Sequence, residues 1–410
     1  MQDIKRNLED KALKNLDMFP AIAIVGARQT GKTTLSKKIC PDWEYFDLEN
    51  TFHYDRISHD PYFFFEQYPS KVIIDEAQLF PELFSILRGV IDAKRHLKGR
   101  FILTGSSSPE LLENISETLA GRIATIELGT LKANEYYGKP LSPFYDIFKN
   151  ALSKENFIEG KPPLTAAQMQ LLWVKGGYPE PILHSDLLFY NQWMENYYNT
   201  YINRDLSRYF PRLDKIAYRR FLLMLGKLSG TIVNKMDLGR AVEVSEKTIR
   251  DYITIAEGTF LWRNLPSFDK NVIKSIIKMP KGHIRDTGLL HYLNRISSET
   301  QLFENPILGS SFEAFVIEEI EKGLQATMLT NLDLYYYRTR GGAEIDLIIE
   351  GPFGILPIEI KYGMGTKIKQ LTALSQFVAE HKLPFGMVIN QTEQITWLTP
   401  NIVQVPVGWL

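Results

Sequence analysis

The chain has 410 residues, of which 44% are hydrophobic and 23% charged, and its formal net charge at pH 7 is −1. This length exceeds one ordinary hydrophobic core, so we expect two or three domains. The single cysteine, Cys40, excludes an intrachain disulfide and fits a reducing compartment. The charged start of the chain lacks the apolar stretch of a signal peptide, and no run approaches the ~20 apolar residues of a membrane span, so we expect a cytoplasmic protein.

The first third of the chain alternates short apolar runs with helical or irregular segments. Residues 1–17 have helical spacing, and the apolar runs that follow span residues 21–25, 45–48, 71–75, 100–104 and 124–128. Short apolar runs separated by helical sequence are typical of buried parallel strands joined by helices. The predicted fold class is therefore α/β, with a parallel sheet in this part of the chain.

A glycine-rich segment directly follows the first apolar run and leads into a predicted helix. Such a turn offers many backbone N–H groups to a phosphate and little steric bulk. We expect Lys32 to neutralise the β- and γ-phosphates of a nucleotide and Thr33 to place its hydroxyl on Mg²⁺. The candidate nucleotide-binding residues are Gly26, Ala27, Arg28, Gln29, Thr30, Gly31, Lys32, Thr33 and Thr34. The segment predicts a P-loop that binds ATP with Mg²⁺.

A second motif lies about forty residues further on, where an apolar run ends in Asp75 and Glu76. Asp75, at the end of a buried strand, is expected to hold the water shell of the metal. Glu76 is then placed to polarise the attacking water. Together with the P-loop, this motif predicts ATP hydrolysis, with Lys32, Asp75 and Glu76 as catalytic residues.

Two further candidates follow the next strand. Thr104 or Ser106, at the end of the run over residues 100–104, is a candidate sensor of the γ-phosphate; the alternative is a strand that merely ends in a polar turn. Arg122 follows a turn and is a candidate arginine finger that reaches a phosphate of its own or a neighbouring subunit. The alternative for Arg122 is an ordinary surface arginine.

The motifs GARQTGKTT, VIIDEAQ, FILTGSSS and LAGR, in this order, resemble those of prokaryotic AAA-type ATPases in which the core precedes a restriction-endonuclease-like domain of uncharacterised function. The resemblance extends over nearly the whole chain and includes GGYPE at residues 176–180 and YINRDL at residues 201–206. It implies kinship with ring-forming ATPases. A homo-oligomer with nucleotide sites near subunit boundaries is therefore expected from the resemblance.

The middle of the chain contains a candidate helix-turn-helix. Residues 236–242 and 246–255 have helical spacing around a short turn, and Ser245 is a suitable cap for the second helix. Residues 259–266 and 271–280 are expected to pair as a wing. Residues 263–285 contain six Lys or Arg against one acidic residue, which suits contact with a phosphate backbone.

The basic residues of this region are the candidate DNA contacts. They are Lys247, Arg250, Lys270, Lys274, Lys278 and Lys281. Two alternatives remain open: a basic face that is only solvated, and a winged-helix module used for protein packing.

The C-terminal region carries a constellation similar to the PD-(D/E)XK nuclease pattern. Glu313 lies in a predicted helix, Asp346 in a predicted strand over residues 342–349, and Glu359 and Lys361 in the next strand. Residues two apart in a strand share a face, so Glu359 and Lys361 point the same way. Asp346 and Glu359 are expected to bind Mg²⁺, with Glu313 nearby and Lys361 positioning water. The alternative is a nuclease fold that only binds DNA or a partner.

The sequence thus predicts a P-loop ATPase core over residues 1–135, a helical region over 136–230, a winged-helix-like module over 231–300 and a nuclease-like domain over 301–410. The main hypothesis is an ATP-driven DNA-processing protein that uses ATP and Mg²⁺. The alternative is a nucleotide-switched protein that acts on a protein partner and carries an inactive nuclease-like scaffold. A third possibility is a self-assembling ATPase whose target is protein.

Overall fold

The computed structural model describes residues 4–410 except for residues 107–114, 116, 156, 158, 207–209, 270–278 and 340. The chain forms two compact units. The N-terminal unit comprises Met1–Leu131 and Thr254–Leu261, and the C-terminal unit comprises Lys132–Ile253 and Trp262–Leu410. Within this described part, no helix combines the length and apolar character needed to cross a membrane.

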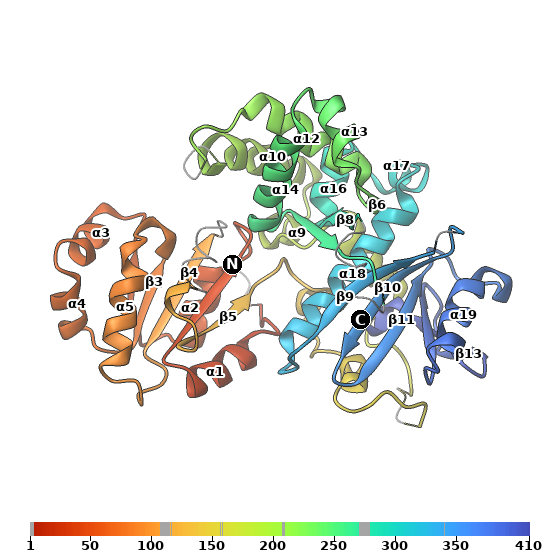
Figure 1. Ribbon diagram of the computed structural model, residues 1–410, viewed down its shortest axis with the longest axis horizontal. Helices are drawn as coiled ribbons and strands as arrows, with labels where there is room; N and C mark the ends of the chain where they lie inside the picture. Colours follow the sequence, from red (N-terminus) through yellow and green to blue (C-terminus); the bar gives the residue numbers. More distant parts are fainter. Residues whose placement is uncertain are drawn as a thin grey trace. The chain divides into compact units, whose positions relative to one another are not determined.

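The N-terminal unit is built on a five-stranded sheet in the order β2-β3-β4-β1-β5 (Figure 1). All neighbouring strands pair in parallel. The strands are β1 (Ala21–Gly26), β2 (Glu44–Asp47), β3 (Val72–Asp75), β4 (Phe101–Ser106) and β5 (Ile123–Glu127). β1 and β3 are buried at every residue, as expected for strands covered on both faces. The predicted parallel α/β sheet is confirmed.

Helical segments precede β1 and connect the parallel strands of this unit, because a parallel pair needs a crossover. They are α1 (Glu9–Met18), α2 (Lys32–Ile39), α3 (Thr51–Ser58), α4 (Pro61–Gln67), the 3₁₀ turn η1 (Ala77–Leu79) and α5 (Glu82–Asp92). Side-chain caps begin two of them: Asn50 accepts a hydrogen bond at the start of α3 and Asp60 at the start of α4. The core beneath these helices includes Val25, Ile74 and Leu103 from neighbouring strands.

The C-terminal unit contains a six-stranded mixed sheet in the order β13-β14-β12-β11-β10-β9. Its strands are β9 (Asp333–Arg338), β10 (Glu344–Gly351), β11 (Gly354–Ile360), β12 (Gly386–Asn390), β13 (Thr396–Thr399) and β14 (Ile402–Pro406). β10 pairs antiparallel with β9 and β11, whereas β12 pairs in parallel with β11 and β14. The strands predicted around Asp346 and Glu359 are therefore neighbours in one sheet.

Helices and short helical turns make up most of the rest of this unit. They are α7 (Ala133–Tyr136), η2 (Pro143–Phe148), α8 (Ala166–Lys175), α9 (Pro179–Leu183), α10 (Leu187–Thr200), the π-helical η3 (Tyr201–Asp205), α12 (Lys215–Leu228), α16 (Thr287–Leu293), α17 (Glu299–Phe303), α18 (Leu308–Ala326), η4 (Ile368–Leu371), α19 (Thr372–Glu380) and η5 (Val407–Trp409).

The candidate helix-turn-helix forms from α13 (Lys235–Val242) and α14 (Glu246–Gly258), near the expected residues. Glu243 has a φ of 63° in the turn, and the Ser245 hydroxyl accepts a hydrogen bond from the backbone N–H of Thr248 (3.0 Å), so Ser245 caps α14 as expected. A three-stranded antiparallel sheet, β6-β8-β7, accompanies the helices. Its strands are β6 (Thr231–Ile232), β7 (Trp262–Leu265) and β8 (Lys281–Ile284).

The pairing of the wing differs from the prediction. β7 lies within the first expected wing segment, but its partner β8 begins at Lys281, immediately after the second expected segment, 271–280. Residues 270–278 lie outside the described residues. The apolar and basic residues of the second expected segment predicted a strand there. Instead, β7 pairs with β8, which follows that segment.

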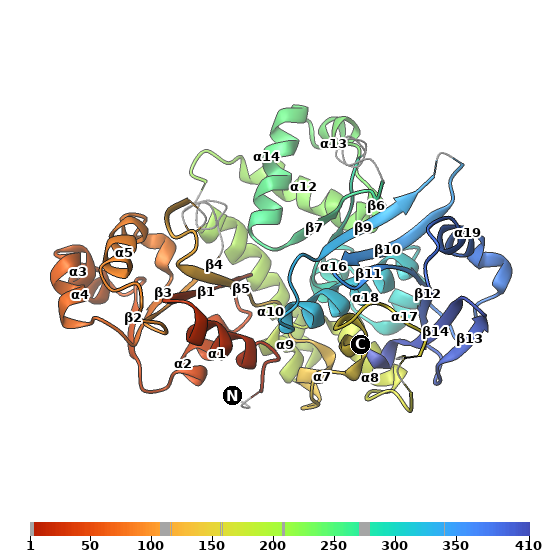
Figure 2. The same cartoon turned by 60° about the horizontal axis from the view of Figure 1, so that its bottom comes forward.

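Helix α18 joins the parts of the C-terminal unit. It packs against β11 of the six-stranded sheet, and both views place it beside that sheet (Figures 1 and 2). Trp173 of α8 donates its indole N–H to the hydroxyl of Ser311 (2.9 Å). Arg263 of β7 forms an ion pair with the buried Glu318 (2.5 Å). The helical region, the three-stranded sheet and the six-stranded sheet therefore pack around one helix.

Candidate functional site

The P-loop motif folds as a strand, a tight loop and a helix. β1 ends at Gly26, whose φ is +151°, and a Cβ at this position would lie 2.2 Å from the carbonyl oxygen of Leu128. The loop ends at Gly31, whose φ of +92° lies in the region that disfavours side chains, and α2 begins at Lys32. Two of the predicted glycines are therefore required by the backbone. The loop leads into the N-terminus of α2, where backbone N–H groups favour an anion.

Lys32 is buried, with 6% of its surface exposed, and its ammonium group bonds to the loop itself. Nζ donates to the carbonyl oxygens of Ala27 (2.8 Å) and Gly26 (3.1 Å). Burial lowers the pKa of Lys32, although the carboxylates of Glu76 and Asp75 act in the opposite direction. The hydrogen-bond partners of the Lys32 ammonium group are therefore backbone carbonyls, which carry no net charge.

Asp75 is the point at which the predicted residues of the N-terminal unit come together. Its Oδ2 accepts hydrogen bonds from the hydroxyls of Thr33 (2.7 Å) and Tyr45 (2.6 Å). Its Oδ1 accepts a short hydrogen bond from the hydroxyl of Thr104. The Asp75 carboxylate therefore binds both Thr33, its expected partner in metal binding, and Thr104, the expected sensor. The residues around it come from α2, β2, β3 and β4.

Glu76 follows β3 directly and adopts a left-handed backbone conformation with a φ of 54°. This conformation is uncommon for residues other than glycine and is found mainly at functional sites and tight turns. The backbone N–H of Glu76 donates to Asp75 Oδ1 (3.2 Å), and the Gln78 amide donates to Glu76 Oε2. The Glu76 side chain is therefore oriented by its own turn.

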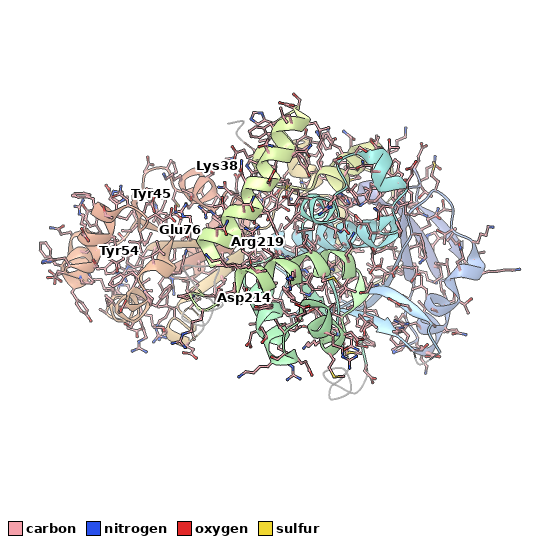
Figure 3. The ribbon with its side chains drawn as sticks, turned by 90° about the horizontal axis from the view of Figure 1, so that it is seen from above. Lys38, Tyr45, Tyr54, Glu76, Asp214 and Arg219 are labelled. Carbon is pink, nitrogen blue, oxygen red and sulfur yellow. The ribbon has the colours of Figure 1, made fainter. Side chains whose placement is uncertain are left out.

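Tyr45 was not identified from the sequence. Its ring lies under the Lys37 ammonium group, 3.5 Å from the ring centroid. Burial, followed by the hydrogen bond to Asp75, raises the pKa of the Tyr45 phenol above its usual value, so the group stays a donor. Tyr45 and Glu76 are labelled in Figure 3. A strand was expected over residues 45–48, but a tyrosine in a strand matches no nucleotide motif.

Arg6 is a second residue that the motifs do not reveal. It is 7% exposed and donates from one guanidinium nitrogen to the carbonyl of Thr30 in the P-loop (2.8 Å). The other nitrogen donates to the carbonyl of Gly129, after β5 (2.8 Å). Arg6 therefore ties the glycine-rich loop to the segment that follows β5. Residue 6 is 24 positions from residue 30, so local spacing carries no signal for this contact.

Arg122 is engaged within its own unit. Two of its guanidinium nitrogens donate to the two carboxylate oxygens of Asp92 on α5, each at 2.8 Å. The hydrogen bond from Arg122 lowers the pKa of the Asp92 carboxyl. An arginine-finger role would require this bidentate pair to open.

The C-terminal unit brings the expected nuclease-like residues together and adds two that were not expected there. We call this group the acidic cluster. Its members are Glu313 of α18, Glu344 and Asp346 of β10, Glu359 of β11, and the lysines Lys281 and Lys361. Glu344 and Asp346 are two residues apart in β10 and therefore share a face. Every member except Glu344 was predicted to be a site residue, although Lys281 was expected on a different surface.

Lys281 lies among three carboxylates of the acidic cluster. Its Nζ is 2.6 Å from Glu313 Oε1, 2.8 Å from Glu344 Oε1 and 3.9 Å from Asp346 Oδ1. Although burial acts to lower its pKa, Glu313, Asp346 and Glu344 together raise the pKa above the ordinary lysine value. Lys281 is 4% exposed, so the expectation that it contacts DNA from a basic surface is wrong. Ion pairs with the carboxylates hold the Lys281 ammonium group in the protein interior.

Lys361 belongs to the other side of the acidic cluster. Its Nζ is 2.5 Å from Glu359 Oε1 and 3.9 Å from Asp346 Oδ2. Asp346 Oδ2 also accepts a hydrogen bond from the backbone N–H of Ile360 (2.7 Å). Within the described residues, the buried oxygen Glu359 Oε2 has no hydrogen-bond partner. Lys361 therefore neutralises charge between the two expected metal ligands.

The acidic cluster holds more carboxylates than ammonium groups. Burial, followed by repulsion from Asp346, raises the pKa of Glu313 to about 8 and that of Glu359 to about 7. Across the residues with described positions, no group of three or more His, Cys, Asp or Glu side chains has a geometry suited to holding a metal ion. The expected Mg²⁺ ligands Asp346 and Glu359 are thus close together, but the arrangement does not fit a bound metal, because lysine ammonium groups lie among the carboxylates.

The remaining candidate DNA contacts divide into two groups. Lys247 and Arg250 are exposed on α14, and Arg250 pairs with Glu246 one turn earlier (2.5 Å). Lys270, Lys274 and Lys278 lie outside the described residues. The described part of the expected basic surface therefore consists of the outer face of α14.

Three family models match successive parts of the chain. Residues 18–137 match the model described as an AAA domain, and they include the P-loop, Asp75, Glu76 and Thr104. Residues 166–300 and 308–410 match two models described as domains of unknown function, the second named DUF4143. The N-terminal unit is therefore an AAA-type ATPase core. The acidic-cluster carboxylates fall within the third match, and Lys281 falls within the second.

Relatives match almost the entire chain. The uncharacterized proteins Rv2008c of Mycobacterium tuberculosis and Mb2031c of Mycobacterium bovis are each 32% identical over 408 residues, which is 98% of this chain and 83% of each relative. Among solved structures, the Walker-type ATPase paby2304 of Pyrococcus abyssi aligns with 71% of this chain and 96% of its own, at 14% identity and a TM-score of 0.42. The chain belongs to the same family as the two mycobacterial proteins, with an AAA-type ATPase domain at its N-terminal end.

Proposed function

We propose that this protein is a Mg²⁺-dependent ATPase that couples ATP hydrolysis to an action on DNA. One observation carries the ATPase part. Thr33, Tyr45 and Thr104 all donate hydroxyl hydrogen bonds to Asp75. In the adjacent P-loop, the described hydrogen bonds of the Lys32 ammonium group go to backbone carbonyls. This donor set suits a nucleotide with a divalent cation. The hydroxyl donors orient the Asp75 carboxylate, and the loop carbonyls orient the Lys32 ammonium group.

The site residues have distinct roles in this proposal. Loop N–H groups and Lys32 bind the phosphates of ATP, while Thr33 and Asp75 hold Mg²⁺. When bound, Mg²⁺ would supply positive charge to the phosphates. Glu76 orients the attacking water and accepts its proton. Thr104 acts by positioning Asp75.

A homo-oligomer would give Arg122 a second role. In this proposal, the guanidinium leaves Asp92 and reaches a nucleotide at a subunit boundary, where it would stabilise the transition state. The exposed position of the Arg122–Asp92 pair supports such an exchange, because an exposed ion pair contributes little to stability and can open at little cost.

DNA contact is proposed for the outer face of α14. A helix that follows a capped turn and precedes the antiparallel strands β7 and β8 has the order of a winged helix-turn-helix, whose second helix enters the major groove. Lys247 and Arg250 are exposed on this helix and would neutralise phosphates. The pair between Arg250 and Glu246 is on the surface and would be exchanged for a phosphate contact at little cost.

ATP hydrolysis by purified wild type and Glu76→Gln, with and without single-stranded, duplex and branched DNA, tests both parts. We expect one DNA form to raise turnover, Glu76→Gln to abolish it, and Lys247→Ala with Arg250→Ala to remove the DNA response without changing basal turnover. Turnover that ignores every DNA form would reject the DNA part. Turnover that survives in Glu76→Gln would reject the assigned base.

A second candidate function is favoured by Lys281. A nucleotide-switched protein that acts on a protein partner would retain the nuclease-like sheet only as a scaffold, and the ammonium group among the carboxylates suits a scaffold better than a cleavage site. Strand cleavage scored in the same reactions separates the candidates. Mg²⁺-dependent cleavage that is lost in Asp346→Ala would reject the scaffold.

A further inference from the structure

We propose that the Lys281 ammonium group takes the place of a metal ion in the acidic cluster, and that removing it turns the cluster into a divalent-cation site. This inference concerns the C-terminal unit alone and does not depend on ATP hydrolysis or on DNA binding.

The position of Lys281 is that of a coordinated cation. Its side chain is 5% exposed, and carboxylate oxygens of Glu313 and Glu344 lie 2.6 Å and 2.8 Å from Nζ. The third carboxylate, Asp346, is 3.9 Å away. These oxygens come from two different elements, α18 and β10, which converge on one positive charge. Magnesium and manganese prefer oxygen ligands of this kind.

The charge balance of the acidic cluster favours a cation at this place. Four carboxylates face two ammonium groups, and the side chains of Glu313, Asp346 and Glu359 are 13%, 12% and 9% exposed. Carboxylates that are close together and withdrawn from water repel one another strongly when no cation lies between them. Loss of the lysine would therefore leave a space lined by negative charge, which a divalent ion would neutralise.

Glu359 supplies an independent sign that the cluster has unused ligand capacity. This residue is more than nine-tenths buried, and its Oε2 has no hydrogen-bond partner among the described residues. Buried carboxylate oxygens are normally satisfied by donors. Its other oxygen contacts Lys361, which also lies near Asp346, so Glu359 belongs to the same group.

The source of the cation gives the arrangement a consequence for the fold. Lys281 is the first residue of β8, in the three-stranded sheet that accompanies the helix-turn-helix, whereas the carboxylates belong to α18 and the six-stranded sheet. Lysine and metal are therefore alternatives: the cluster either holds β8 through its lysine or coordinates an ion. In the described structure the lysine holds this position.

Binding of Mn²⁺ to the full chain without nucleotide tests the proposal, with free Mn²⁺ measured by electron paramagnetic resonance. We expect Lys281→Met to bind one more equivalent than wild type, and this equivalent to be absent from Lys281→Met with Asp346→Asn. Lys322→Met is the matched control, because Lys322 contacts the carboxylate of Glu319 outside the cluster (2.6 Å). Saturating Mn²⁺ should raise the Tm of Lys281→Met by ~5 °C or more and that of the control by no more than wild type.

Two outcomes would overturn the proposal. One is a folded Lys281→Met protein, judged by circular dichroism, whose Mn²⁺ stoichiometry equals that of wild type. The other needs no lysine variant: if wild type itself binds a Mn²⁺ ion that is lost in Asp346→Asn, the lysine does not replace the metal. Lys281→Met that folds only when Mn²⁺ is present would support the proposal, provided that Lys322→Met folds without it.

Discussion

The two units of this protein each bury a lysine near carboxylates, and the two lysines have opposite environments. Lys32 is 6% exposed and donates to two loop carbonyls, and burial lowers its pKa. Lys281 is 4% exposed and lies among three carboxylates, which raise its pKa. Lys32 has neutral hydrogen-bond partners, whereas the charge of Lys281 is compensated by carboxylates within the protein.

The carboxylates of the two units also differ in whether their partners are neutral or charged. Asp75 is held by the hydroxyls of Thr33, Tyr45 and Thr104, which orient it without neutralising its charge. Asp346 lies between two ammonium groups, each 3.9 Å from one of its oxygens. Buried charge thus remains available to ligands in the N-terminal unit and is compensated internally in the C-terminal unit.

Replacing Lys281, whose charge compensates the carboxylates of the acidic cluster, should have the largest effect on stability. Lys281→Met leaves Glu313, Glu344 and Asp346 without their cation, and we expect it to lower the free energy of unfolding by about 3–5 kcal/mol at pH 8 in the absence of divalent ions. Urea unfolding of wild type and variant measures the loss. Adding Glu313→Gln to Lys281→Met should recover part of it, because one repelling charge is removed. Equal stability of Lys281→Met and wild type would mean that the pairing makes no net contribution.

Replacing Lys32 should lower ATP turnover and leave the free energy of unfolding nearly unchanged. Lys32→Ala deletes an ammonium group whose protein partners are carbonyls, and we expect kcat/KM for ATP to fall by roughly 10²–10³-fold. Steady-state hydrolysis measures the rate, and urea unfolding measures the stability. A Lys32→Ala protein that lost both to a similar degree would show that the two lysines have the same role.

Burial lowers the pKa of a basic group without carboxylate hydrogen-bond partners in the C-terminal unit as well. His291 contacts the carbonyl of Val174 (2.8 Å) and the hydroxyl of Ser311 (2.7 Å), and burial lowers its pKa to about 4. Because the unfolded imidazole titrates near 6.5, His291 stabilises the fold fully above that pH, and the contribution is lost as pH falls towards 4.

The loss attributable to His291 should amount to about 2 kcal/mol between pH 7.5 and pH 5. His291→Gln, which cannot titrate, should reduce the pH dependence of the unfolding free energy by that amount over the same range. Urea unfolding at the two pH values gives both slopes. An unchanged slope in His291→Gln would assign the acid sensitivity to other groups.

The smallest effect is expected at Tyr45. Tyr45→Phe removes one of three hydroxyl donors to Asp75 and keeps the ring beneath Lys37, so we expect kcat/KM for MgATP to fall about five- to tenfold. Thr104→Val removes a donor to the other carboxylate oxygen and serves as the matched variant. If Tyr45→Phe and wild type have the same kinetics, the phenol does not position Asp75.

Motifs contiguous in the sequence predicted which residues of the N-terminal unit lie together around Asp75. The apolar runs foretold the five parallel strands, and the residues that follow β1 and β3 meet at one edge of the sheet because the strands are parallel. In the C-terminal unit, the spacing of Asp346, Glu359 and Lys361 indicated that their side chains lie close together, and they do. Contacts between distant segments were not predictable: Tyr45 with Asp75, Arg6 with Thr30, and Arg122 with Asp92.

Lys281 shows why the charge pattern of the middle region was misleading. Six basic residues against one acidic residue over 263–285 indicated a positive surface, but a count along the chain does not record the acidic residues that fold against it. Glu313 and Glu344 lie more than thirty positions away and bury the ammonium group.

The sequence by itself determined the P-loop, the residues that end each strand and the presence of two α/β sheets, because local spacing sets which elements form and which face of each is apolar. The tertiary structure alone decided which side chains from other elements surround each charged group. That choice depends on packing between segments far apart in the chain, and it surrounds the Lys32 ammonium group with loop carbonyls and the Lys281 ammonium group with carboxylates.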